Sequence, residues 1–234
     1  MDYEFDEAQR VLAGYAFGPS DSDRHWKNRE SFSVGAEPSA REPLRYAYQS
    51  YDCVPASKGP LDMADIVVST GLNSRISART MLAIYALAPD ISAELALLPP
   101  PSTFWELDEP ELCTAPDPPR QVRHMWRAWW LLMGIPGVGV AVTHKTLHHK
   151  RPRLCPLLDG KTVPYYRDGH PWAGIHRELT AHEAEFRDLE AWFAERADAR
   201  GGVGLSRLRL HDILLWCHAT KNRTPCDALG RELV

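Results

Sequence analysis

The stretch GIPGVG, residues 134–139, decides the fold. Its three glycines permit positive φ angles and close approach of the backbone, and the proline among them fixes one φ angle. A Trp-rich amphipathic segment, residues 120–133, precedes the stretch and residues 140–150 follow it, so the pattern predicts a helix, a tight turn and a second helix. The first amides of that second helix suit a phosphate oxygen. Gly137 and Gly139 are therefore predicted to bind phosphate.

The same stretch carries a family resemblance. Ile135–Gly139, followed by a helix and then by PLLD at residues 156–159, resembles the hairpin of the helix-hairpin-helix DNA glycosylase superfamily. The resemblance covers residues 119–166 well and the flanking helices only in general character. It implies that the hairpin amides hold a DNA backbone phosphate, often with a monovalent cation bound by hairpin carbonyls. It also implies a catalytic aspartate about 20 residues after the last hairpin glycine, where Asp159 stands.

Two departures limit the activity that this resemblance implies. Ala141 stands two residues after the last hairpin glycine, where strand-cleaving members carry a lysine that forms a Schiff base, so no lyase is expected. The C-terminus has Cys217 and Cys226 in place of the cysteine cluster of the iron–sulfur members.

A second likeness extends further along the chain. KRPRLCPLLDGKTV at residues 150–163, with MADIVVSTGL before it and LSRLRLHDILLW after it, is similar to an uncharacterised bacterial protein family over residues 60 to about 218. This likeness supports the layout and implies no activity.

Length and composition predict one sizeable globular domain or two closely packed lobes. The chain has 234 residues, 44% of them apolar, and no run of 18 apolar residues that would predict a membrane span. The N-terminus is acidic where a secretory signal is basic and then apolar, so we expect a cytoplasmic protein with no membrane partner. The five cysteines include no C-x-x-C pair, which argues against a disulfide framework and a cysteine-bound metal.

Positive charge is concentrated in one part of the chain. Residues 118–158 contain no acid and carry +7, and because the whole chain carries −4, the rest carries −11. Such a stretch commonly meets phosphates, and the alternative is a solvated helix face whose acids come from elsewhere in the fold. His144 and His148 share a helix face, but no acid lies nearby in sequence to complete a metal site, so none is expected. The predicted phosphate-binding side chains are Lys145, His148, Lys150, Arg151, Arg153 and Lys161.

The remaining sequence predicts further helices. Asp6–Ala16 is amphipathic, and a polar irregular run follows it. Apolar residues at three- and four-residue spacing predict core helices within 62–72 and 77–90, with Ser77 capping the second helix and Pro89 ending it. A proline-rich connection follows near residues 106–119.

These patterns together predict an all-α protein. We expect a two-lobed helical bundle with a helix-hairpin-helix element, DNA-glycosylase-like in architecture. Residues 1–60 are predicted to be an irregular N-terminal extension packed on or near the core, and residues 61–234 the glycosylase-like domain.

Asp159 and three tryptophans form the predicted catalytic site. Cleavage of an N-glycosidic bond develops positive charge on the sugar. A carboxylate below the ring stabilises this charge or activates the water that attacks the sugar. Trp126, Trp130 and Trp172 would stack on the extruded base, although Trp at helical spacing is more often a core residue. Asp159 also fits an ordinary N-cap for the segment after it. Asp212 is either structural or a second carboxylate of the pocket.

These features favour a monomeric, monofunctional DNA glycosylase that cleaves an N-glycosidic bond with an aspartate and needs no cofactor. Two alternatives stay open. One is a non-catalytic DNA-binding protein that kept the hairpin, and the other is a hydrolase of nucleosides or nucleotides that uses the same aspartate.

Overall fold

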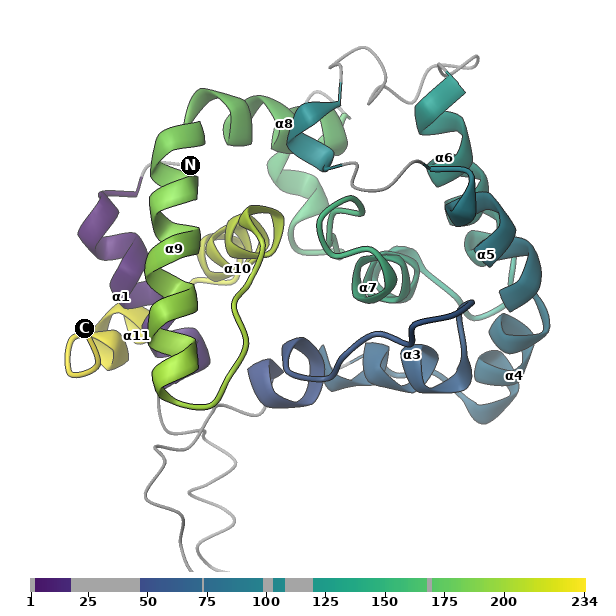
Figure 1. Ribbon diagram of the computed structural model, residues 1–234, viewed down its shortest axis with the longest axis horizontal. Helices are drawn as coiled ribbons and strands as arrows, with labels where there is room; N and C mark the ends of the chain where they lie inside the picture. The colour runs from purple at the N-terminus through teal and green to yellow at the C-terminus, as the bar shows by residue number, and fades with distance from the viewer. Residues whose placement is uncertain (1–2, 18–46, 73, 99–102, 108–119, 168–169) are drawn as a thin grey trace, which may run out of the picture.

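The computed structural model describes residues 3–17, 47–72, 74–98, 103–107, 120–167 and 170–234, and only the backbone of residues 120–123 (Figure 1). Within these residues every regular element is helical and no strand forms, which confirms the all-α prediction. The elements are α1 (Phe5–Ala16), η1 (Tyr48–Asp52), α3 (Met63–Val68), η2 (Ser69–Leu72), α4 (Ala78–Ala86), α5 (Ala88–Ala96), η3 (Phe104–Glu106), α6 (Arg120–Met133), α7 (Val140–Lys150), η5 (Val163–Tyr165), α8 (Pro171–Ala181), α9 (Glu183–Ala199), α10 (Arg207–Ala219) and α11 (Arg223–Gly230). The predicted irregular run after α1 and the proline-rich connection lie almost wholly outside the described residues.

The helices gather into two groups with α7 between them (Figure 1). In one group α1 packs against α9, α10 and α11, and in the other α5 packs against α4 and α6 while α3 packs against α4. The central helix α7 contacts α3 and α6. None of the helices that the structure describes is both long and apolar enough to cross a membrane.

Short polar side chains begin three of the helices. Asp62 and Asp65 form a reciprocal capping box at the start of α3, and the Ser206 hydroxyl accepts a hydrogen bond from the third residue of α10. Ser77 caps α4 as predicted, but α4 ends at Ala86 and not at Pro89. Pro89 instead lies in the first turn of α5, where its missing N–H and fixed φ angle are tolerated. The single helix predicted for this segment is therefore two helices.

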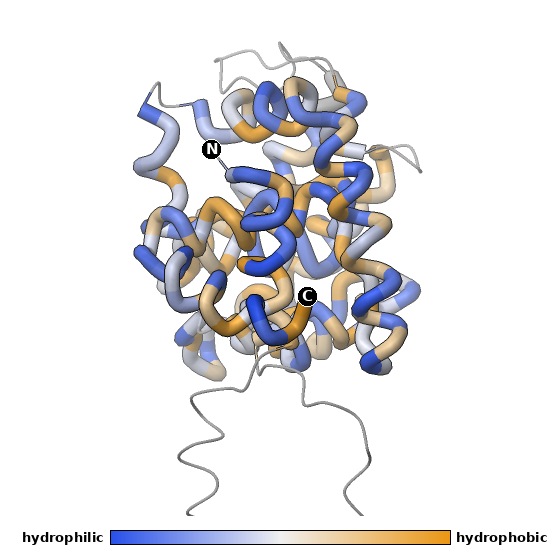
Figure 2. The backbone as a smooth tube through the Cα atoms, turned by 90° about the vertical axis from the view of Figure 1, so that its left-hand side faces the viewer, coloured by the Kyte–Doolittle hydropathy of each residue, from blue (hydrophilic) through white to orange (hydrophobic). Residues whose placement is uncertain are grey.

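The centre of the molecule is formed by α7 and α10, which are buried on nearly every side. Hydrophilic and hydrophobic residues alternate along most of the helices (Figure 2). This pattern is typical of a helix that packs one apolar face against the core. In contrast, α7 buries a run of polar side chains from Thr143 to Thr146 together with its two later histidines. Buried polar groups need partners, so α7 and α10 are where a functional arrangement of polar residues is expected.

The N-terminal helix α1 belongs to this core and does not lie outside it. Val11 and Leu12 are fully buried, and α1 crosses the C-terminal helix α11 at glycines. A Cβ atom at Gly230 would lie 1.8 Å from the carbonyl oxygen of Arg10, and one at Gly14 would lie 2.0 Å from that of Cys226. The two ends of the chain are therefore joined by direct backbone contact between helices.

We expect Gly230→Ala to lower the free energy of unfolding by about 2 kcal/mol, because the added methyl group forces α1 and α11 apart. Urea denaturation monitored by circular dichroism measures the change. Gly59→Ala is the matched control, since open space surrounds the Cβ position there, and it should change stability by less than about 0.5 kcal/mol. Equal stability of the two variants would contradict the close crossing.

Candidate functional site

The GIPGVG turn joins α6 to α7 and leaves the first amides of α7 uncapped by any side chain. Gly137 has a φ angle of 87°, in the left-handed region that favours glycine. Gly139 is the N-cap of α7 in an extended conformation, and it has no side chain with which to cap the helix. A helix start of this kind presents N–H groups and the positive end of the helix dipole to an anion.

A cavity of about 630 Å³ lies against this turn. It is lined by five of the predicted site residues, which come from the turn, from α7 and from the loop after α7. These five are Gly137, Gly139, Lys145, Asp159 and Lys161. The same cavity is lined by α10 and by Ser74 and Arg75, which precede α4.

Asp159 uses one carboxylate oxygen to hold its own loop. Its Oδ1 atom accepts hydrogen bonds from the N–H groups of Lys161 at 2.7 Å and Thr162 at 3.0 Å. This is the capping role that the sequence allowed for this residue, here at a turn that leads into η5. Its Oδ2 atom accepts no hydrogen bond from the described residues, and the side chain is half-buried at the cavity wall. Capping and catalysis therefore do not exclude one another at Asp159.

Lys145 lies inside the molecule and not on its surface. Only 6% of the residue is exposed, and its Nζ atom donates to the carbonyl oxygen of Leu72 at 2.6 Å. Burial lowers the pKa of Lys145, and the carboxylates of Asp159 and Asp212 act against that shift. Its charge therefore contributes positive potential to the cavity wall.

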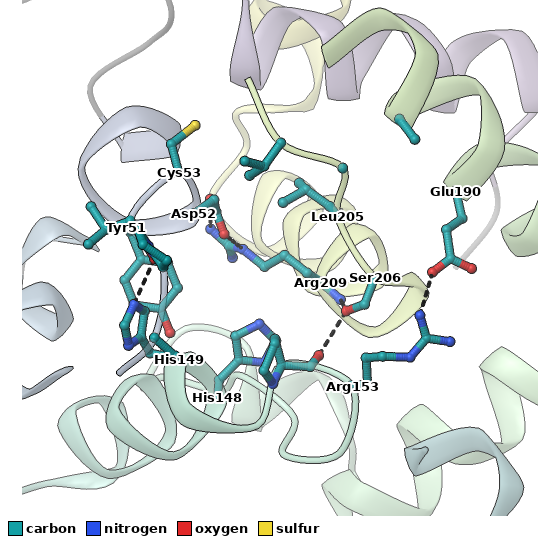
Figure 3. A pocket seen from close by; sticks show the side chains of 17 residues that line it. Tyr51, Asp52, Cys53, His148, His149, Arg153, Glu190, Leu205, Ser206 and Arg209 are labelled. Carbon is teal, nitrogen blue, oxygen red and sulfur yellow. Dashed lines mark hydrogen bonds and ion pairs between the residues drawn. The ribbon is translucent and has the colours of Figure 1, made fainter. Parts of the chain in front are cut away.

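The other predicted phosphate-binding side chains lie at the end of α7 or just after it. They form hydrogen bonds or ion pairs with other residues of the protein. Lys150 pairs with the buried Asp65 at 3.1 Å, and Arg151 donates to the carbonyl oxygen of Leu95. Arg153 turns toward Glu190 at 3.6 Å (Figure 3). These three residues and His148 do not line the cavity at the turn. These four residues therefore lie away from the cavity at the turn, and phosphate binding by them stays a prediction.

His148 is an interior residue with a neutral ring. Its Nδ1 atom donates to the carbonyl oxygen of Cys155 at 2.7 Å, and burial lowers the pKa of His148 to about 3. His144 is buried as well, and burial lowers its pKa to about 4. Within the described part of the chain, no three His, Cys, Asp or Glu side chains come close enough together to hold a metal ion.

The three predicted base-stacking tryptophans do not line the cavity. Trp172 is buried and stacks on Trp126 with ring centroids 4.1 Å apart, and its indole N–H donates to His144. Trp130 has 64% of its surface exposed on the outside of α6. Trp172 is a core residue and Trp126 packs against the core, so the stacking of these three tryptophans on a base stays a prediction. The aromatic residues that do line the cavity are Tyr15 and Trp216.

Asp212 was predicted from the sequence as either structural or a second pocket carboxylate, and the other cavity residues of α10 and of the segment before α4 were missed. Arg209, Asp212 and Trp216 follow one another at three- and four-residue spacing, so they share one face of α10. That spacing is a signal that was present in the sequence, although it reads equally as a packed helix. Ser74 and Arg75 line the cavity from the segment before α4, and the Ser74 hydroxyl is buried without a hydrogen-bond partner among the described residues. No periodic signal marks that segment.

Three carbonyls hold the turn in shape. The carbonyl of Gly139 accepts a hydrogen bond from the Thr143 N–H inside α7. The carbonyl of Ile135 accepts from the Val138 N–H, and that of Leu132 accepts from the Ile135 N–H. The monovalent cation that the resemblance implies stays a prediction.

A second cavity, of about 530 Å³, is also lined by Arg209 (Figure 3). Its wall contains the pair formed by Arg209 and Asp52, in which Nε contacts Oδ1 at 2.7 Å and Nη2 contacts Oδ2 at 2.9 Å. Arg209 therefore contributes to the lining of both cavities.

Comparison with known proteins identifies the family of this chain. The chain belongs to a family described as "Family of unknown function (DUF6308)", whose model matches residues 35–219. That span contains the turn, Asp159 and the cavity-lining face of α10. No curated protein and no solved structure matches the chain.

Proposed function

We propose that this protein hydrolyses the N-glycosidic bond of a nucleotide extruded from DNA, with Asp159 as the catalytic carboxylate and the GIPGVG turn as a helix-hairpin-helix phosphate clamp. One observation carries the proposal. The cavity is lined both by the turn glycines and by the carboxylate of Asp159. The Oδ1 atom of this carboxylate accepts two backbone hydrogen bonds, and its Oδ2 atom accepts none from the described residues. Phosphate binding and bond cleavage need these two features within the length of one nucleotide.

The chemistry follows from where charge develops. As the C1′–N bond breaks, the sugar becomes oxocarbenium-like, and a fixed carboxylate lowers the energy of that state because it needs no reorganisation. Water then adds to C1′ and gives its proton to Asp159. The hydrogen bonds that Oδ1 accepts from Lys161 and Thr162 hold the carboxylate in one orientation.

The dimensions and charge of the cavity suit a nucleotide. A volume of about 630 Å³ lies within the usual range of roughly 300–1,000 Å³ for small-ligand pockets. Arg75 and Lys161 are exposed where they line the cavity, and Lys145 adds buried positive charge. Extrusion of a base costs roughly a few kcal/mol, which phosphate contacts and stacking on Trp216 would offset.

We expect Gly139→Ala to weaken binding to duplex DNA about tenfold without changing stability, because its methyl group would occupy the space through which a phosphate reaches the α7 amides. The protein itself leaves open space at that Cβ position. Fluorescence anisotropy over a salt series, with duplexes that carry an abasic-site analogue, measures the affinity. Gly59→Ala, which also has open space but lies away from the cavity, is the control. Unchanged affinity in Gly139→Ala would contradict the phosphate clamp.

A second candidate is a hydrolase of free nucleotides that uses the same cavity. The observation that favours it is the pairing of Lys150 with the buried Asp65 and of Arg153 with Glu190, which offsets part of the positive charge of the basic stretch. The same salt series separates the two candidates. Binding to duplex DNA that weakens steeply with salt favours the glycosylase, whereas release of base from free nucleotides without duplex binding favours the small substrate. Duplex binding with no base release at all would indicate the non-catalytic alternative.

A further inference from the structure

Two buried carboxylates share one guanidinium beside the candidate cavity. Arg209 is 3% exposed and binds Asp52 through two hydrogen bonds, at 2.7 and 2.9 Å. Its Nη1 atom also contacts Asp212, which lies one turn further along α10 and is 4% exposed. Both Asp212 and Arg209 line the cavity that contains Asp159.

The charges of this cluster do not balance. The acids whose charges act on Asp212 are Asp52 and Asp159, and the cations are Arg209 and Lys145. Three carboxylates would exceed these two cations, and an unmatched carboxylate away from water is expensive, so one of the acids retains a proton. Asp52 has the two-point contact that favours a carboxylate ion, whereas Asp212 has a single contact. Burial raises the pKa of Asp212 to about 7, against the lowering effect of Arg209 and with a further rise from the Asp159 carboxylate. Asp212 is thus the member that carries a proton near neutral pH.

We propose that Asp212 is the general acid of the reaction and donates its proton to the departing base, opposite in role to Asp159. This inference rests on the proposed function, because it assigns the second proton transfer of that same cavity. Two carboxyl groups in one cavity can take opposite roles when their surroundings differ, and the surroundings of these two differ. Asp159 is half-buried with two N–H donors, whereas Asp212 is buried beside a second carboxylate.

Charged and titratable groups from several elements surround Asp212. Arg209 lies on its own helix, and the Asp159 carboxylate is the group that faces it across the cavity. The other groups whose charge interacts with Asp212 are Tyr15 of α1, Tyr51 and Asp52 of η1, Lys145 of α7 and Tyr166 after η5. The pKa values of the three tyrosines are raised by burial, so they stay neutral near pH 7, and burial lowers the pKa of Lys145.

The reaction balances with these two groups and water. Asp212 gives its proton to a base nitrogen while the C1′–N bond breaks and its electron pair passes to the base. Water forms the new C1′–O bond and its proton passes to Asp159. The products are free base and a sugar hydroxyl. The proton on Asp159 then returns to Asp212 through solvent, which restores the starting state.

The experiment compares a neutral leaving base with one that already carries a positive charge. Single-turnover base release is measured against pH from duplexes containing uracil or hypoxanthine, and from duplexes containing 7-methylguanine. A cationic base leaves as a neutral molecule and needs no proton. In the wild-type protein we expect release of a neutral base to fall above about pH 7, and release of 7-methylguanine to show no such fall.

The variant Asp212→Asn keeps an oxygen for Arg209 and removes the proton donor. It should slow release of a neutral base about 100-fold, abolish the fall at high pH and leave 7-methylguanine release within about threefold of wild type. Asp188→Asn, an exposed residue of α9, is the control. Thermal melting checks that the variants fold, and the wild-type pH comparison tests the proposal even if Asp212→Asn does not fold.

The outcomes separate this proposal from the function on which it rests. If the wild-type protein releases a neutral base with no high-pH limb, or Asp212→Asn matches it, the general-acid role is overturned and the glycosylase proposal stands. If the wild-type protein releases none of these bases, the glycosylase proposal fails and the role of Asp212 fails with it.

Discussion

Replacing Asp159 with asparagine is expected to lower the rate of base release from DNA by about 10³-fold and to leave DNA affinity and thermal stability unchanged. Asparagine retains the side-chain oxygen that the N–H groups of Lys161 and Thr162 require, so the loop after α7 keeps its turn. What it removes is the negative charge that faces the developing positive charge on the sugar. Single-turnover kinetics on duplexes carrying uracil, hypoxanthine or 7-methylguanine give the rate.

Asp159→Asn and Asp159→Ala together distinguish the two roles of this residue. If Asp159 only caps its turn, asparagine should be fully active and alanine should lose about 1 kcal/mol of stability. If it is catalytic, both variants are inactive and only alanine is destabilised. Full activity of Asp159→Asn in a protein that does release base would therefore remove Asp159 from the mechanism.

Local sequence chemistry predicted the parts of the fold that depend on neighbouring residues. The helices on both sides of GIPGVG, the cap at Ser77 and the amphipathic helix near residues 6–16 all follow from spacing within one or two turns. The placement of Asp159 near the turn was predicted through the resemblance, and the cavity brings the two together. The helix-hairpin-helix and glycosylase-like character of the fold stays a prediction.

Long-range pairing is what the sequence did not reveal. The stretch with +7 looks like a surface patch because its acids lie far away in the chain: Asp65 precedes Lys150 by 85 residues, and Glu190 follows Arg153 by 37. The spacing of apolar residues predicts which face of a helix is buried, but it cannot predict burial of a helix such as α7, whose buried residues are mostly polar. The same limit hid the link between Asp52 and Arg209, which lie 157 positions apart.

Removing the Asp65 carboxylate is expected to destabilise the protein more than any other single substitution considered for the fold. Asp65 is fully buried and accepts hydrogen bonds from the N–H groups of Ser57 at 2.9 Å and Asp62 at 3.1 Å, and it pairs with Lys150 at 3.1 Å. Asp65→Ala leaves the buried Lys150 ammonium without its counter-ion, which should cost about 3 kcal/mol in the free energy of unfolding. Urea denaturation at pH 7 measures this loss. Asp188→Ala, an exposed acid on α9, should change stability by less than about 0.5 kcal/mol.

The same carboxylate should contribute to acid unfolding. Burial alone would raise the pKa of Asp65, but the hydrogen bonds from Ser57, Asp62 and Lys150 prevail and lower it to about 2. A folded pKa below the unfolded value of 3.8 means that the stabilisation is present above about pH 4 and is lost as the pH falls toward 2. This term amounts to about 2 kcal/mol, and Asp65→Asn should remove it while keeping the side-chain shape. Stability curves of wild type and Asp65→Asn that stay parallel between pH 5 and about pH 2 would show that the pKa of Asp65 is the same in the folded and unfolded protein.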